Sequence, residues 1–192
     1  LLNKKYYTGR ALDNRMGGFM IAEVARLLKE SKTKLPFGLY ICNSVQEEVG
    51  LRGAEMIVRK INPNIAIVTD VCHDTTTPMI DKKEHGEFKC GKGPVITYAP
   101  AVHSIIRELI LDTAENEKIA IQRDAASRVT GTDTDAFAYN GGGVPSALIS
   151  LPLKYMHTTV ETVAKSDVED VIKLIFETLK KISPKMKLKY LH

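Results

Sequence analysis

The sequence lacks the features of a disulfide-stapled or membrane-inserted protein. It has no tryptophan and only three cysteines, Cys42, Cys72 and Cys90, none of which forms a CxxC pair. An odd number of separated cysteines argues against a disulfide framework and is typical of a reducing compartment. No apolar run approaches the roughly eighteen residues that a membrane-spanning helix needs. We therefore expect a cytoplasmic protein with no membrane partner.

The sequence also has little excess positive charge and lacks two common functional motifs. The formal net charge is only +4, and no basic stripe interleaved with aromatic residues indicates a nucleic-acid surface. A G-x-S-x-G nucleophile elbow is missing, which disfavours serine hydrolase chemistry. The glycine-rich stretches at 91–94 and 140–145 do not match a phosphate-binding loop. We expect no nucleic-acid partner.

The chain does contain alternating helical and strand patterns within a single domain. Its 192 residues are 44% hydrophobic, which is enough for one real core. Apolar periodicity predicts helices at 14–30, 51–61, 101–116, 133–140 and 166–182, and strands at 37–44, 64–70, 94–100, 118–124 and 144–153. This alternation is typical of an α/β three-layer sandwich, in which helices cover both faces of a mostly parallel, mixed sheet.

Acidic residues and a histidine fall where a site is expected in such a fold. Sites in open α/β sheets form beyond the carboxyl ends of the strands. Glu47 and Glu48 follow the first predicted strand, Asp70 closes the second, His157 follows the last, and Asp13 precedes the first helix. Four separate segments are thus expected to bring these side chains to one edge.

This set of side chains suits a divalent metal ion. Zinc accepts imidazole nitrogen and carboxylate oxygen, and carboxylates bridge paired ions in hydrolytic sites. Adjacent side chains leave an extended backbone in opposite directions. One of Glu47 and Glu48 could then bind a metal while its neighbour acts on a water molecule.

Each of these residues also has a simpler interpretation. Asp13 could cap the first helix, and Asp70 could accept hydrogen bonds from loop amides. His157 could be an ordinary hydrogen-bonded histidine, and the Glu47–Glu48 pair could be solvated at the start of helix 51–61. The residues alone leave the metal site and these structural roles equally open.

The segment 71–93 is the least regular part of the chain, and loops of that length are usually functional. Within it, His73 and Asp74 could contact a metal or simply be solvated. Farther along, Asp133 and Asp135 could line a pocket or cap the short helix at 133–140.

Four motifs in order resemble one enzyme family. They are "GRALDNRMGG", "QEEVGLRGA", "VTD" and "YMHTTVE". Together they resemble the dinuclear-zinc aminopeptidases, a family that includes glutamyl aminopeptidases, TET aminopeptidases and proteins called cellulase M. The resemblance implies a zinc-peptidase-like fold, a peptide substrate and two divalent ions, zinc or alternatively cobalt or manganese.

The resemblance also implies a role for each candidate residue. Asp13 would bridge the two ions, Glu48 would bind one and Asp70 the other, and His157 would complete the shell of the ion held by Glu48. Glu47 would be the catalytic base. The alternatives are a related metal-dependent deacylase or dipeptidase, and a catalytically inactive binding domain of the same fold.

One element of the family pattern is not found in this sequence. The family has a further metal-binding histidine in a His-x-Asp motif on an earlier strand, followed by an inserted dimerisation domain. None of His73, His85 and His103 stands in such a motif. We expect residues 1–192 to form the C-terminal portion of the catalytic domain, with the N-terminal strands and the dimerisation domain outside it. With those segments present, a homo-oligomer is expected.

Overall fold

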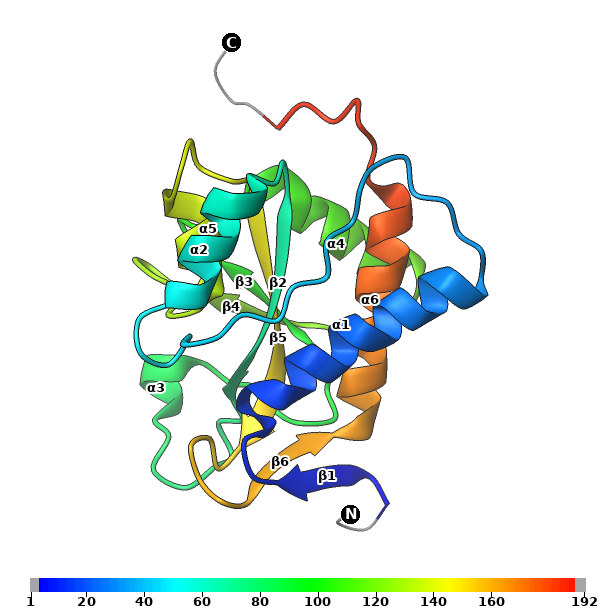
Figure 1. The fold of residues 1–192 in the computed structure, drawn as a ribbon. Helices are drawn as coiled ribbons and strands as arrows, with labels where there is room; N and C mark the ends of the chain where they lie inside the picture. The colour runs from blue at the N-terminus through cyan, green and yellow to red at the C-terminus, as the bar shows by residue number, and fades with distance from the viewer. Residues whose placement is uncertain (1–3, 189–192) are drawn as a thin grey trace.

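A six-stranded mixed sheet forms the centre of the molecule (Figure 1). The computed structural model describes residues 4–188. The elements in order are β1 (Tyr6–Gly9), α1 (Leu12–Glu30), α2 (Arg52–Ile61), β2 (Ala66–His73), α3 (Lys82–His85), β3 (Val95–Tyr98), α4 (Ser104–Asn116), β4 (Gln122–Ala125), α5 (Asp133–Tyr139), β5 (Ser146–Lys154), β6 (Glu161–Ala164) and α6 (Lys165–Lys181). All five predicted helices are present, and so are four of the five predicted strands, although the strand predicted at 118–124 begins only at Gln122.

Strand β5 organises the sheet. Along one side it pairs in parallel with β2 over eight residues. Along its other side it pairs antiparallel first with β3 and then with β6. Strand β3 pairs in parallel with β4, and β6 pairs antiparallel with β1. Its first eight residues are all buried. Unbroken burial of this kind marks a strand covered on both faces, which the apolar run at 144–153 predicted.

Helices cover both faces of the sheet, so the three-layer arrangement is confirmed. Helices α1, α4 and α6 pack together on one side, and α2 and α5 pack together on the other (Figure 1). Helix α1 places Met16, Met20 and Val24 at helical spacing against the core. Complete burial of a side chain such as Met20 contributes about 1.5–3 kcal/mol.

The predicted strand at 37–44 is wrong for the chain as described. Residues 37–44 carry no strand assignment and join no sheet within residues 4–188. Leu39, Tyr40 and Ile41 are 38%, 69% and 43% exposed. An apolar run becomes a strand only when a neighbouring strand supplies hydrogen bonds, and none lies beside it in the described part.

Three short elements were not predicted. Strands β1 and β6 pair with each other at one edge of the sheet. Helix α3 forms a single turn inside the irregular segment 71–93. Each has four residues, too few for a periodic signal. No helix within residues 4–188 is long and apolar enough to cross a membrane.

Candidate metal centre

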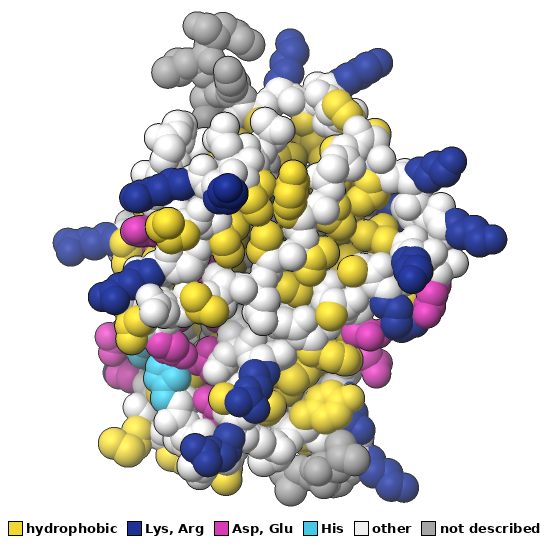
Figure 2. Space-filling model, viewed as in Figure 1, with side chains coloured by type: hydrophobic (Ala, Val, Ile, Leu, Met, Phe, Trp, Pro, Cys, Tyr) yellow, Lys and Arg dark blue, Asp and Glu magenta, His cyan; other side chains and the backbone are white. Residues whose placement is uncertain are grey.

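The five predicted site residues line a single cleft. Asp13, Glu47, Glu48, Asp70 and His157 all contribute to the walls of this space of about 380 Å³. Acidic side chains gather with a histidine on this part of the surface, at the lower left of Figure 2. Side chains from four separate segments of the chain are therefore brought together as the sequence predicted.

Three of the five lie close enough together to bind one cation. The Nε2 atom of His157 lies 3.1 Å from Oδ2 of Asp13 and 3.4 Å from Oε2 of Glu48. One donor atom from each residue lies within 4.8 Å of the other two. One imidazole nitrogen with two carboxylate oxygens is a donor set that zinc and similar ions accept. The arrangement therefore fits a divalent ion.

Asp13 does not cap the first helix. That role falls to Asn14, whose Oδ1 atom accepts a hydrogen bond of 2.7 Å from the amide of Gly17. A side chain on Gly17 would begin 2.6 Å from this oxygen, so the close approach requires glycine. The side chain of Asp13 is 9% exposed and lies against His157.

Asp70 also lines the cleft, and a hydrogen bond ties it to the start of α1. Its Oδ1 atom accepts hydrogen bonds from Nδ2 of Asn14 at 3.1 Å and from the amide of Val71 at 2.8 Å. Asp70 does not end its strand as predicted, because β2 continues to His73. The carboxylate therefore projects from within a strand, which fixes its position more firmly than a loop would.

The two adjacent glutamates stand in a turn rather than on an extended backbone. The carbonyl of Glu47 accepts hydrogen bonds from the amides of Gly50 and Leu51, each at 3.0 Å. The turn is held against α2 because Gly53 approaches Val45, whose backbone a Cβ atom at Gly53 would meet at 2.3 Å. The expectation that Glu47 and Glu48 lie on an extended backbone is therefore wrong, although both side chains still line the cleft.

Burial and mutual repulsion raise the pKa values of three carboxyl groups. Burial, followed by the charge of Glu48, raises the pKa of Asp13 to about 6 and that of Glu47 to about 7. Burial is also the main reason that the pKa of Asp70 rises to about 8, against the lowering effect of the Val71 amide. Like charges in a partly desolvated site need a cation to remain ionised together.

Glu161 is a site residue that the sequence did not single out. It is 2% exposed and lies at the start of β6. Its Oε2 atom accepts a hydrogen bond from the amide of Asp13 at 3.2 Å, and its Oε1 atom accepts one from the amide of His157 at 2.8 Å. One buried carboxylate thus positions the backbone of two candidate ligands. The only available signal was its place at the end of the motif "YMHTTVE".

The other polar candidates have different roles. His73 lines the cleft, whereas Asp74 is buried and accepts hydrogen bonds from the amides of Thr76 and Cys90. Asp135 accepts hydrogen bonds from two loop amides, and Asp133 accepts one from the hydroxyl of Ser44. The buried polar atoms that lack a partner among the described residues include Oδ1 of Asp133.

Comparison with known proteins gives a consistent match over the chain. A family model described as M42 glutamyl aminopeptidase matches residues 1–174. The lysyl aminopeptidase of Pyrococcus furiosus is 35% identical over 173 residues, covering 90% of this chain and 48% of that protein.

Two solved structures are similar as well. A TET aminopeptidase from the archaeon Thaumarchaeota archaeon SCGC AB-539-E09 superimposes with a TM-score of 0.87 at 29% identity, covering 96% of this chain and 52% of the other. The Pyrococcus horikoshii TET1 peptidase gives a TM-score of 0.76 at 30% identity, and the match covers 92% of this chain and 50% of the other. The chain spans about half the length of the curated relatives it matches.

Proposed function

This chain belongs to the M42 glutamyl aminopeptidase family, and on that basis we propose that it carries catalytic residues of a metal-dependent aminopeptidase. In this proposal the protein hydrolyses the first peptide bond of a peptide and releases the N-terminal residue. The cluster of Asp13, Glu48 and His157 carries the proposal, because their donor atoms are close enough to hold one cation.

Four residues of the cleft are the proposed metal ligands. Asp13, Glu48 and His157 would hold one divalent ion, and Asp13 would share a second ion with Asp70. The family resemblance favours zinc, with cobalt or manganese as alternatives, since all three accept these donors. When bound, such ions polarise a scissile carbonyl and make water more acidic.

Glu47 is the proposed general base. Its carboxylate would take a proton from the attacking water and deliver it to the nitrogen of the leaving peptide, which departs as a free amine. Burial and the neighbouring Glu48 raise the pKa of Glu47 to about 7. This value belongs to the metal-free cleft, and bound cations would lower the pKa of Glu47 and favour the carboxylate form that a general base needs.

An acidic cleft also suits a substrate with a free α-amino group. Carboxylates of Glu84 and Asp124 line the cleft in addition to the proposed site residues. Negative charge in a partly desolvated cleft attracts a protonated amine and disfavours an N-acylated terminus. The acidic lining therefore favours an exopeptidase over a deacylase.

The assembly and location of the protein are proposed from its relatives. The Pyrococcus horikoshii TET1 peptidase can assemble into a tetrahedron or a large octahedral shell. We propose that the complete protein is likewise a homo-oligomer. A cytoplasmic location agrees with three cysteines that all remain free.

Metal binding is the first test of the proposal. Zinc titrated into the chelator-treated chain should bind at one site or more per chain, as measured by calorimetry and elemental analysis. His157→Ala should lower the bound metal. Less than one ion per chain would overturn the metal centre.

Substrate cleavage tests the reaction class. We expect hydrolysis of aminoacyl-nitroanilides with a free amine by the full-length, metal-loaded protein, and no hydrolysis of the N-acetylated counterparts. Cleavage of only the acylated series would favour a deacylase. Metal binding without cleavage of either series would favour an inactive binding domain.

A further inference from the structure

The turn that carries Glu47 and Glu48 (residues 45–51, the glutamate turn) has little packing of its own. Its valines, Val45 and Val49, are 67% and 58% exposed. A segment with few buried apolar contacts opens easily unless hydrogen bonds hold it. The two glutamates therefore keep a fixed place in the cleft only if contacts outside the turn anchor it.

The backbone of the glutamate turn is also strained. Gln46 and Leu51 have φ angles of 60° and 57°, in the left-handed region that residues other than glycine rarely occupy. Such conformations persist where surrounding contacts enforce them, and they cluster at functional sites. A turn without its anchors would relax toward ordinary backbone angles and would move the side chain of Glu47.

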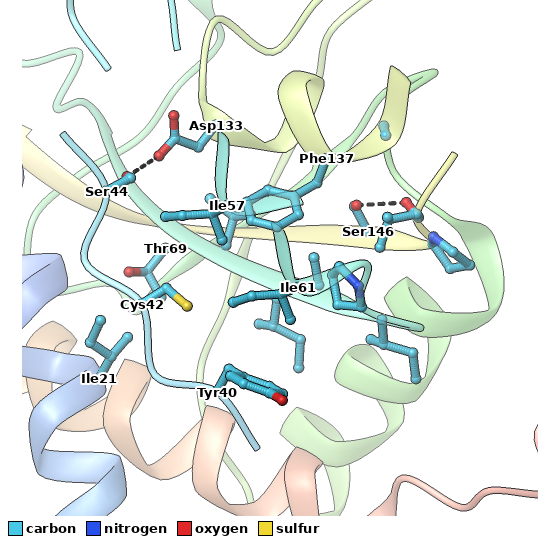
Figure 3. A pocket seen from close by; sticks show the side chains of 18 of the residues that line it. Ile21, Tyr40, Cys42, Ser44, Ile57, Ile61, Thr69, Asp133, Phe137 and Ser146 are labelled. Atoms are coloured by element: carbon cyan, nitrogen blue, oxygen red, sulfur yellow. Dashed lines mark hydrogen bonds between the residues drawn. The ribbon is translucent and has the colours of Figure 1, made fainter. Parts of the chain in front are cut away.

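Two anchors hold the turn, one on each side. On the C-terminal side the amide of Gly53 donates a hydrogen bond of 3.0 Å to the carbonyl of Val45, which fixes the turn to α2. On the N-terminal side the hydroxyl of Ser44 donates to Oδ2 of Asp133, the first residue of α5 (Figure 3). Among the described residues, this is the only hydrogen bond made by segment 37–44. Asp133 thus fixes the point at which the chain enters the turn.

Helix α5 is a firm base for this second anchor. The hydroxyl of Thr132 caps the helix by accepting a hydrogen bond from the amide of Thr134 at 3.2 Å. At the other end, the amide of Val144 donates to the carbonyl of Phe137 at 3.1 Å, so α5 is joined to the segment that enters β5. Asp133 is 9% exposed, so its side chain has little freedom to move.

The carboxylate of Asp133 is costly to keep at this position. Burial raises its pKa, and the hydrogen bond from Ser44 opposes that rise. Its Oδ1 atom is buried without a hydrogen-bond partner in the described part of the chain, which destabilises the fold. A buried group that is incompletely satisfied calls for a reason other than stability.

We propose that Asp133 and Ser44 are positioning residues for the two glutamates. Asp133 acts through the Ser44 hydroxyl and holds the turn so that Glu47 meets the attacking water and Glu48 meets the metal ion. The inference rests on the proposed function for these roles of Glu47 and Glu48. The anchoring of the turn is a property of the fold and does not depend on catalysis.

Amide exchange in the metal-free chain tests the anchor. The amides of Gly50 and Leu51 donate to the carbonyl of Glu47, so their exchange reports opening of the turn. Ser44→Ala should speed this exchange by about tenfold or more, because a hydrogen bond to a charged group is lost. Exchange along β5 should stay unchanged, which separates local opening from global unfolding. Ser44→Thr keeps the hydroxyl and should restore the original rates.

Ser146→Ala is the matched control. The hydroxyl of Ser146 donates to the carbonyl of Val144 at 2.7 Å, in the same pocket but away from the glutamate turn (Figure 3). Its loss should not change the exchange of the turn. Asp133→Asn keeps the size of the side chain but replaces a charge-assisted bond by a neutral one of about half the strength. Its exchange should rise less than that of Ser44→Ala, and it provides a second test if Ser44→Ala does not fold.

Kinetics of the full-length, metal-loaded protein test the consequence for catalysis. At saturating zinc, Ser44→Ala should lower kcat by about 10–100-fold, because the general base is misplaced, while KM changes little. Ser44→Thr should recover kcat. An equal fall in kcat for Ser146→Ala would show a general structural effect and would overturn the positioning role.

The two readouts fail separately. Unchanged exchange of Gly50 and Leu51 in both Ser44→Ala and Asp133→Asn would overturn the anchor, whether or not the protein cleaves peptides. Faster exchange with an unchanged kcat would overturn the positioning role. Faster exchange together with no peptidase activity in the unaltered protein would support the anchor and would overturn the proposed function instead.

Discussion

The amide of His157 donates a hydrogen bond of 2.8 Å to the buried carboxylate of Glu161, which stands four residues later in the chain. The same carboxylate accepts a hydrogen bond from the amide of Asp13, which lies 148 residues earlier in the chain. The spacing of two candidate ligands therefore depends on a residue that is not itself one of the three clustered donors.

Glu161→Gln should disturb this arrangement while keeping the size of the side chain. One carboxylate oxygen becomes an NH₂ group that faces a backbone N–H, so a buried hydrogen bond is lost at a cost of about 1–3 kcal/mol. We also expect zinc affinity to fall about 10–100-fold. Urea unfolding and zinc titration measure both effects. Glu169→Gln, on the exposed side of α6, is the control and should change neither.

Glu47→Gln should separate proton transfer from metal binding. Loss of the general base should lower turnover by about 10²–10⁴-fold. Metal content should be nearly unchanged, since Glu47 lies outside the three-donor cluster of the described residues. Glu169→Gln, on the exposed side of α6 and outside the cleft, should retain activity. Near-normal turnover of the Glu47 variant would show that the base is another group.

His157→Ala, unlike Glu47→Gln, should lower metal binding. Removing the imidazole leaves only Asp13 and Glu48 in the cluster, so metal occupancy itself should fall. Elemental analysis after dialysis against a fixed zinc concentration measures the change. His85→Ala is the matched control, because His85 lines the cleft but lies outside the cluster. Equal losses in both variants would contradict the assignment of His157.

The metal-free chain should lose stability as the pH rises. The pKa of Asp70 is raised from 3.8 to about 8, so the native state holds this proton more tightly than the unfolded state. The stabilisation is fully present below about pH 4 and is lost as the pH rises through 8. Urea unfolding across this range should show the decline, and Asp70→Asn should reduce it. A free energy of unfolding that instead increased from pH 4 to pH 8 would contradict the raised pKa.

Gly17→Ala should destabilise the start of α1. A methyl group there would lie 2.6 Å from Oδ1 of Asn14 and would displace the amide that reaches Asp70. Overpacking of this kind costs about 1–3 kcal/mol. At Gly18 the added carbon would meet Asn43 at 3.5 Å, an ordinary contact. Thermal unfolding should therefore show a lower midpoint for Gly17→Ala and a slightly higher one for Gly18→Ala, because alanine is favoured over glycine inside a helix.

Local patterns predicted most of the fold. Met16, Met20 and Val24 recur at helical spacing, and β5 is an unbroken apolar run, so both elements were evident from neighbouring residues alone. The segment 37–44 shows the limit of such patterns. Its composition is that of a strand, but strand pairing depends on a partner that local sequence does not specify.

The candidate site was predictable to a similar degree. The positions of Asp13, Glu48, Asp70 and His157 near strand and helix ends brought them to one cleft, as expected from the topology. The supporting contacts of Asn14 and Glu161 could not be predicted. Each residue joins segments that are far apart in the chain, and the identity of one polar residue does not indicate which distant group it will contact.

The open edge of β2 has a consequence for the life of this polypeptide in a cell. Within residues 4–188, β2 pairs only with β5, so the backbone groups along its other edge have no strand partner there. An unpaired strand edge is a template for pairing with other chains and a recognised origin of aggregation. We therefore expect the 192-residue chain to aggregate more readily as its concentration rises.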